Sequence, residues 1–97
     1  MNYCLHPEAE NDLRDAASFY RDQADAVLSH AFLTEFERTM RMLLQHPRMG
    51  AQYRKGRRRF VMRRFPFSVI YNVSGEEIQI LAIAHHSRRP GFWRDRK

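Results

Sequence analysis

The chain contains little cysteine, glycine or proline, and it has no long apolar run. Its 97 residues include one cysteine, four glycines and four prolines. The single thiol, Cys4, excludes an internal disulfide, which agrees with a reducing compartment, and we expect it to be a small buried residue of a strand. No segment approaches the roughly 20 apolar residues of a membrane span, and the N-terminus lacks a basic and then apolar signal region. The sequence therefore predicts a cytoplasmic protein that does not bind membranes.

Metal, nucleotide and nucleophile motifs are also missing. The five histidines form no helical i, i+4 pair, and no cysteine cluster lies beside them. There is no glycine-rich phosphate loop and no nucleophile elbow. We therefore expect no metal and no cofactor.

Charge is distributed unevenly along the chain. Residues 1–47 carry four Lys or Arg against eight Asp or Glu, a balance of −4, whereas residues 48–97 carry thirteen against three, a balance of +10. A hydrophobic content of 43% indicates a globular domain rather than a disordered one. The basic half is expected to attract a polyanion or an acidic protein partner.

Apolar periodicity divides the chain into one strand, two helices and a run of strands. Residues 7–24 and 27–44 repeat apolar side chains at spacings of three and four, which is typical of amphipathic helices. Since so short a chain needs both helices to cover a sheet, we expect a hairpin bent near residues 22–25. Strands are expected at residues 2–6, 59–65, 67–73 and 78–84, with a turn at 74–77. The predicted fold class is α+β, in a single domain of residues 1–97.

Four segments of the chain resemble one known family. They are "HPEAENDL", "HPRMG", "RRFPFSVIYNV" and "ILAIAHHSRRPGFW", and they occur in the order found in the RelE/ParE superfamily of toxins from bacterial type II toxin–antitoxin modules. The resemblance implies a strand, a helical hairpin and a twisted antiparallel sheet, with toxicity neutralised by a small acidic antitoxin. RelE-like members cut messenger RNA on the ribosome, whereas ParE-like members act on DNA gyrase, so the fold alone does not decide the function.

The chemistry of RNA cleavage requires a base, an acid and cations for the phosphate. If the chain were a nuclease, Arg63, His86 and Arg88 would carry these roles. Adjacent strand residues point to opposite faces, so only one of His85 and His86 can face the arginines, and simple alternation groups His85 with residues 79, 81 and 83. The resemblance further places Ser68 where several ribonuclease members carry an arginine. The segments "FPFSVIY" and "HHSRRPGFW" look closer to the ParE-like branch, and we expect no catalytic residue.

The remaining predictions concern binding surfaces. The predicted target-binding residues are Arg54, Lys55, Arg57, Arg58, Arg59, Arg64, Arg89 and Trp93. The alternative for Trp93 is that its indole packs the tail back onto the sheet, and the alternative for the basic run at 53–59 is a solvated loop. The predicted antitoxin-binding residues are Leu13, Phe32, Phe36 and Tyr71, with a free sheet edge as a further contact.

Three functions follow from these observations. The first is a ParE-like toxin that inhibits DNA gyrase, and the second is a ribosome-dependent mRNA endoribonuclease. The third is a basic nucleic-acid-binding domain without toxicity.

Overall fold

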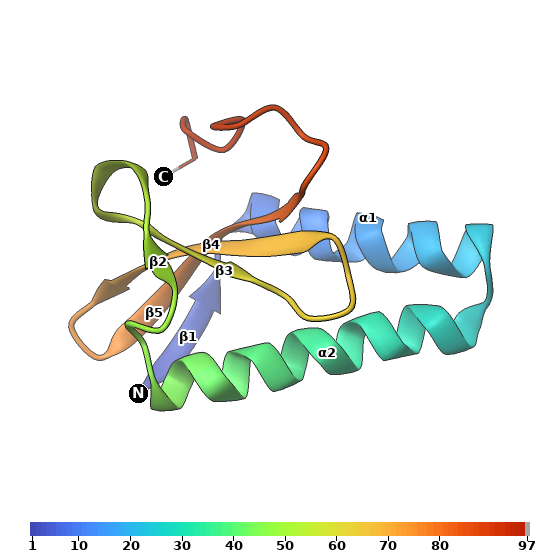
Figure 1. Cartoon of the computed structure of the whole chain (residues 1–97), viewed down its shortest axis with the longest axis horizontal. Helices are drawn as coiled ribbons and strands as arrows, with labels where there is room; N and C mark the ends of the chain where they lie inside the picture. Colours follow the sequence, from blue (N-terminus) through green and yellow to red (C-terminus); the bar gives the residue numbers. More distant parts are fainter. Residues whose placement is uncertain (97) are drawn as a thin grey trace.

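A helical hairpin packs on one face of a five-stranded sheet (Figure 1). The computed structural model describes residues 1–96. The elements are β1 (Asn2–Leu5), α1 (Pro7–Gln23), α2 (Ala26–Gln45), β2 (Ala51–Gln52), a 3-10 turn (Arg54–Gly56), β3 (Arg58–Val61), β4 (Phe67–Ser74) and β5 (Glu77–His85). The strand order is β1-β5-β4-β3-β2. The predicted α+β class is confirmed.

The sheet is mixed rather than wholly antiparallel. Strands β2 to β5 form the expected antiparallel meander, but β1 adds to β5 in parallel, pairing Tyr3 with Ile78. Strand β1 is therefore an edge, and Cys4 lies opposite Gln79 on the face without helices. This position leaves Cys4 exposed, so the prediction of a buried thiol is wrong.

Local sequence signals set the ends of the helices. Pro7 occupies the first turn of α1, and the ring of His6 accepts a hydrogen bond from the Glu8 amide at 3.0 Å. Asp25 caps α2 by accepting from the Leu28 amide at 2.8 Å. The predicted hairpin is therefore confirmed, with its bend at residues 24–25. Neither helix within residues 1–96 is long and apolar enough to cross a membrane.

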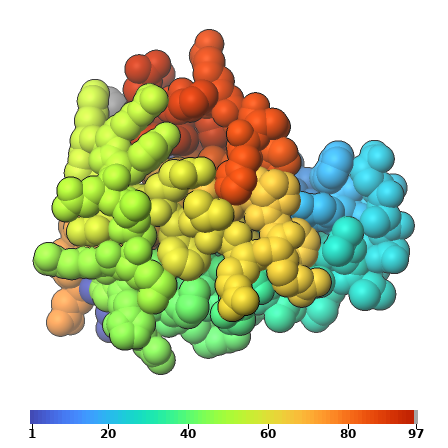
Figure 2. All heavy atoms as spheres, viewed as in Figure 1, coloured from blue at the N-terminus to red at the C-terminus, as the bar shows by residue number. Residues whose placement is uncertain are grey.

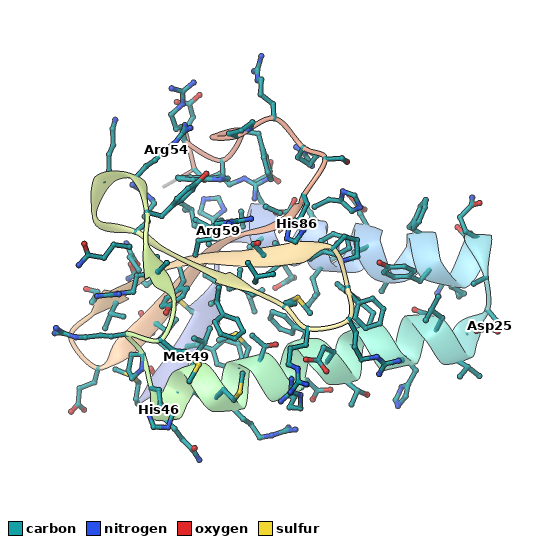
Figure 3. All side chains as sticks on the ribbon, in the orientation of Figure 1. Asp25, His46, Met49, Arg54, Arg59 and His86 are labelled. Carbon is teal, nitrogen blue, oxygen red and sulfur yellow. The ribbon has the colours of Figure 1, made fainter. Side chains whose placement is uncertain are left out.

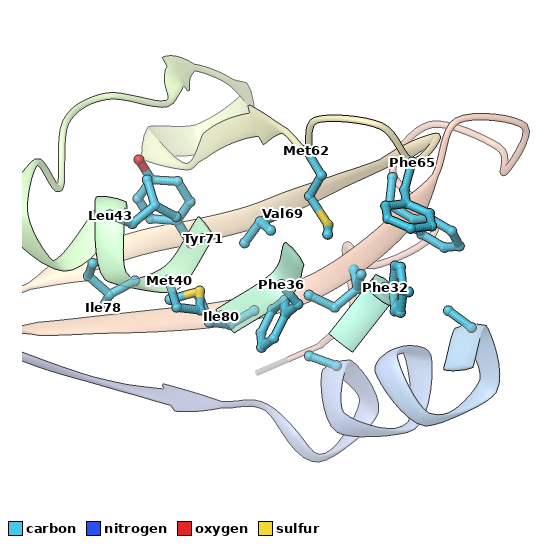
Figure 4. Close-up of a cluster of buried hydrophobic side chains, with 14 residues drawn as sticks. Phe32, Phe36, Met40, Leu43, Met62, Phe65, Val69, Tyr71, Ile78 and Ile80 are labelled. Carbon is cyan, nitrogen blue, oxygen red and sulfur yellow. The ribbon is translucent and has the colours of Figure 1, made fainter. Parts of the chain in front are cut away.

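The main core lies between α2 and the sheet (Figure 4). Phe32 and Phe36 of α2 are 0% and 3% exposed, and Tyr71 of β4 is 0% exposed. The Tyr71 hydroxyl donates to the Pro47 carbonyl at 2.7 Å and accepts from the Gly50 amide at 2.9 Å, which ties the loop after α2 to the sheet. Burial raises the pKa of this phenol. These three side chains form the core, so they do not offer the surface that an antitoxin would contact, whereas Leu13 is half-buried at its margin.

A β-bulge changes the faces of β5. Ile70 pairs with Ala82, but Tyr71 pairs with Ile80, so Leu81 has no partner on β4. Beyond the bulge the alternation is inverted: Ile83 joins the main core, and Ala82 faces the opposite side of the sheet. Alternation therefore groups His85 correctly with Ile83, but it is wrong by one residue for positions 79 and 81, which lie before or at the bulge.

Candidate functional site

The C-terminal tail (residues 86–96) folds over the face of the sheet that the helices leave free. Trp93 is 2% exposed and packs with Ile70 and Ala82 in a second, smaller core, which we call the tail cluster. The Tyr53 ring lies 5.8 Å from the indole. Figure 2 shows the tail, in orange and red, against the green basic turn, residues 53–57. Of the two predictions for Trp93, packing against the sheet is the one that the structure confirms.

A buried ion pair fastens the end of the tail to α1. Arg96 Nη1 lies 2.5 Å from Asp12 Oδ2, and the same carboxylate accepts from the Ile83 amide at 3.1 Å. Arg96 Nη1 also reaches the Leu81 carbonyl, at 3.2 Å. The Arg96 side chain is 13% exposed and the Asp12 side chain is 9% exposed. Acidic residues are common in the N-terminal half of a helix, so the sequence around Asp12 does not indicate this ion pair.

A small cationic pocket opens between the tail and the sheet, and we call it the basic pocket. It has a volume of about 100 Å³. Its polar groups come from β3, β4, the end of β5 and the start of the tail, with aromatic rings beside them: Tyr53, Arg59, Ser68, His85, His86, Arg88, Arg89, Phe92 and Trp93. Figure 3 shows Arg59 and His86 on the same side of the sheet. The guanidinium of Arg88 stacks over the Phe92 ring at 3.7 Å.

The two adjacent histidines have different environments. His86 Nε2 lies 2.9 Å from Ser68 Oγ in the basic pocket. Burial, the nearby Arg59 charge and His85 lower the His86 pKa, so its imidazole is neutral at pH 7. The His85 ring instead packs edge-on against the Phe67 ring, and the two ring centroids are 4.9 Å apart. Both rings line the basic pocket, so the structure does not confirm the prediction that only one of them faces the arginines.

Several predicted target-binding residues gather around this pocket. Arg59 and Arg89 line it, and Arg54 and Lys55 are exposed on the adjoining basic turn. The Arg54 guanidinium lies against the tail, because a Cβ at Gly91 would be 2.9 Å from its Nη1. Arg88 also lines the pocket, so the pocket and the adjoining basic turn together carry five cations.

Other predicted residues have different surroundings. Arg57 is half-buried, with its guanidinium 5.5 Å from the Trp93 ring centre. Arg58 donates to the Gly50 carbonyl at 2.9 Å, so it supports the loop after α2. Arg64 lies in the β3–β4 loop, over the Phe65 ring at 5.6 Å, and Arg63 is its exposed neighbour. Neither Arg63 nor Arg64 lines the basic pocket.

The basic pocket can bind an anion through arginine guanidinium groups, the Ser68 hydroxyl and a neutral imidazole. It contains His86 and Arg88 of the conditional nuclease set, but Arg59 takes the place expected for Arg63. Residues 1–96 contain no group of three His, Cys, Asp or Glu side chains that could hold a metal ion.

Comparisons with family models, with curated proteins and with solved structures all indicate the same family. The model of the ParE toxin of type II toxin–antitoxin systems (parDE) matches residues 3–90. Toxin ParE2 from two Mycobacterium tuberculosis strains, CDC 1551 and H37Rv, is 29% identical over 86 residues, which is 89% of this chain and 82% of the relative. A solved structure described as the chromosomal ParDE toxin–antitoxin system of P. aeruginosa aligns with a TM-score of 0.77 and 26% identity, covering 88% of this chain and 95% of that one.

The family match spans most of the chain, and it includes both helices and every strand of the described fold except the first residue of β1. It also favours the ParE-like branch over the nuclease branch, in agreement with the incomplete nuclease set of the basic pocket. The chain belongs to the ParE toxin family of type II toxin–antitoxin systems.

Proposed function

We propose that this toxin inhibits DNA gyrase by binding it, and that a small acidic antitoxin neutralises it. Arg54, Lys55, Arg59, Arg88 and Arg89 are proposed to bind the target, either at an acidic surface of gyrase or at the phosphates of its bound DNA. Such contacts give affinity and fast encounter without requiring a chemical step. No cofactor or metal is part of the proposal.

The composition of the basic pocket is the observation that favours gyrase over messenger RNA. Cleavage needs a base and an acid placed on either side of a phosphate. Both His85 and His86 line the pocket, but the His85 ring packs edge-on against Phe67 and its Nδ1 accepts from the Ser87 amide at 3.0 Å. Arg63, the predicted phosphate ligand, belongs to the β3–β4 loop and does not line the pocket. This arrangement supports binding rather than cleavage.

Ribosome-dependent mRNA cleavage is the second candidate, because Arg59, His86 and Arg88 do converge on one pocket. An imidazole with a lowered pKa beside two cations is a plausible base for a 2′-hydroxyl. The third candidate, a harmless nucleic-acid-binding domain, requires only the positive surface.

Inducing the chain by itself in cells separates the three functions. We expect growth arrest, relaxed plasmids on chloroquine gels and intact messenger RNA by primer extension. The double variant Arg59→Gln/Arg89→Gln should restore growth and supercoiling, whereas Arg21→Gln/Arg41→Gln, which changes two exposed helix arginines, should remain toxic. Cleaved messenger RNA with normal supercoiling would establish the nuclease function instead, and unimpaired growth of the wild type would support the harmless domain.

The antitoxin is proposed to contact the exposed apolar side chains of the helical hairpin rather than its core. Phe19 and Val27 are 58% and 77% exposed near its tip. Half-buried Leu13 remains a candidate contact, together with the free edge of β1. Co-expression with a small acidic protein encoded beside the toxin should restore growth. A double change of Phe19 and Val27 to serine should keep toxicity but weaken this rescue.

A further inference from the structure

A second pocket lies on the face of the sheet without helices, beside β1, and no function described above uses it. We call it the β1 pocket, and its volume is about 480 Å³. Cys4, Gln79 and the apolar side chain of Leu81 contribute to its lining, and His6 lies where the chain enters α1. This volume falls within the range of pockets that hold small organic groups.

Two buried polar atoms in the lining residues of this pocket are unmatched. Arg57 Nε and Asn72 Oδ1 are inaccessible to solvent and have no hydrogen-bond partner among residues 1–96. Arg57 precedes β3, and because Arg58 pairs with Tyr71, the Arg57 and Asn72 positions are neighbours across the two strands. A buried donor and a buried acceptor left without partners are unfavourable in a free protein. A ligand that supplies one acceptor and one donor would satisfy both once the Arg57 and Asn72 side chains turn towards the pocket.

The charges around the pocket indicate the charge of the ligand that it would bind. Arg57 and Arg96 both line it, but Arg96 is paired with Asp12. No carboxylate from the described part of the chain lines the pocket. One cation therefore remains without a counter-charge, beside the positive N-terminal end of α1. A singly charged anion fits this balance.

We propose that the β1 pocket binds an aspartate or glutamate side chain from an extended segment of a protein partner. The carboxylate would accept from Arg57, an adjacent main-chain N–H would donate to Asn72, and the side-chain methylenes would lie on Leu81. The pocket also adjoins the free edge of β1, where an extended chain can run alongside. This inference deepens the proposed antitoxin partnership by assigning its acidic residues a specific site.

A peptide fits this pocket better than a nucleic acid does. Binding of single-stranded nucleic acid relies on aromatic rings on which bases stack. The β1 pocket contains no Phe, Tyr or Trp, whereas the basic pocket contains three such rings. The two pockets therefore differ in the chemistry that they offer.

The test is an NMR titration of the full-length ¹⁵N-labelled chain, made by cell-free synthesis. The probe is N-acetyl-glutamate N-methylamide, which carries one carboxylate and two amide N–H groups. We expect it to shift the backbone signals of Cys4, Leu5, Asn72 and Gln79 at millimolar concentrations. The uncharged glutamine analogue should bind at least about tenfold more weakly, because a hydrogen bond to a charged group contributes at least that factor to the binding constant.

Variants connect this binding to the pocket. Arg57→Gln should weaken binding about tenfold, whereas Lys55→Gln, with the same charge change in the same basic turn, should leave it unchanged. Arg57 also touches Trp93, so a second variant covers the case in which Arg57→Gln does not fold. Asn72→Asp places a carboxylate beside Arg57 and should abolish binding of the probe.

Three results would overturn the proposal. They are the absence of shifts at these four signals, equal binding of the glutamine analogue, and tighter binding of thymidine 5′-phosphate than of the glutamate probe at the same signals. The last result would assign the pocket to nucleic acid. Gyrase inhibition does not enter this titration, so failure of the proposed target and failure of the pocket are distinguishable.

Discussion

The Asp12–Arg96 pair makes a sharp prediction about the stability of the tail. Changing Asp12 to Asn preserves the volume of the side chain but removes the charge that faces Arg96 at 2.5 Å and weakens the acceptor of the Ile83 amide. Breaking a buried ion pair from one side typically costs about 3–5 kcal/mol, since the other charge is left without compensation.

Here the expected loss is smaller, because Arg96 lies in the tail outside any helix or strand and can turn towards water once it is released. We therefore expect the free energy of unfolding to fall by about 2–3 kcal/mol, just below the range for a fixed buried pair. Asp22→Asn is the matched control. It removes the same charge from α1 at a side chain that is 69% exposed, and it should change stability by less than about 0.5 kcal/mol.

Trp93 provides the assay, because it is the only tryptophan of the chain and is 2% exposed. In Asp12→Asn its emission should move to longer wavelength, and acrylamide should quench it, at urea concentrations where the far-UV circular dichroism is still native. The control should show neither change. If Asp12→Asn matches Asp22→Asn in both stability and quenching, the ion pair does not hold the tail on the sheet.

Three further predictions concern the core and the basic pocket. Gly50→Ala would place a Cβ 2.6 Å from the Tyr71 hydroxyl, and it should lower the free energy of unfolding in urea by about 1–3 kcal/mol. Gly75→Ala is the control, because the space there is open but φ is +61°, so it tests backbone strain without a clash. An equal loss of stability in both variants would refute the steric argument. The pKa of His86 is lowered, so the folded state binds its proton less readily than the unfolded chain does, and stability should fall as the pH drops through the ordinary value of 6.5. His86→Gln should remove this part of the pH dependence, and an NMR titration that places the His86 pKa above the ordinary value of 6.5 would contradict the assignment. Phe36→Ala should lower the free energy of unfolding by about 3–5 kcal/mol; an antitoxin-binding defect with unchanged stability would contradict its place in the core.

The features that the sequence predicts well are those encoded by near neighbours. The helical stripes, the Asp25 bend and the strand at 67–73 each depend on spacings of two to four residues, and the structure contains all of them. The stripe of α2 also shows that Phe32 and Phe36 face something apolar. It does not show whether that surface is the chain's own sheet or a partner, and in the structure these two side chains pack against the chain's own sheet.

The features that the sequence does not predict depend on distant pairs. Asp12 and Arg96 are 84 positions apart, and neither has a local pattern that indicates the other. The bulge at Leu81 arises from the register between β4 and β5, so simple alternation along β5 misplaces His85 relative to Ile80. The basic pocket needs both features, because the bulge aims His86 and the ion pair holds the tail over it.

The most direct test of the account is a supercoiling assay with purified gyrase, relaxed plasmid and this chain, in the absence of ribosomes. The account predicts that the wild type inhibits supercoiling and that Arg21→Gln/Arg41→Gln inhibits equally. It also predicts that Arg59→Gln/Arg89→Gln, with the same charge change at the basic pocket, does not inhibit. Full supercoiling at a saturating concentration of folded wild-type chain, together with cleavage of messenger RNA when ribosomes are added, would contradict it.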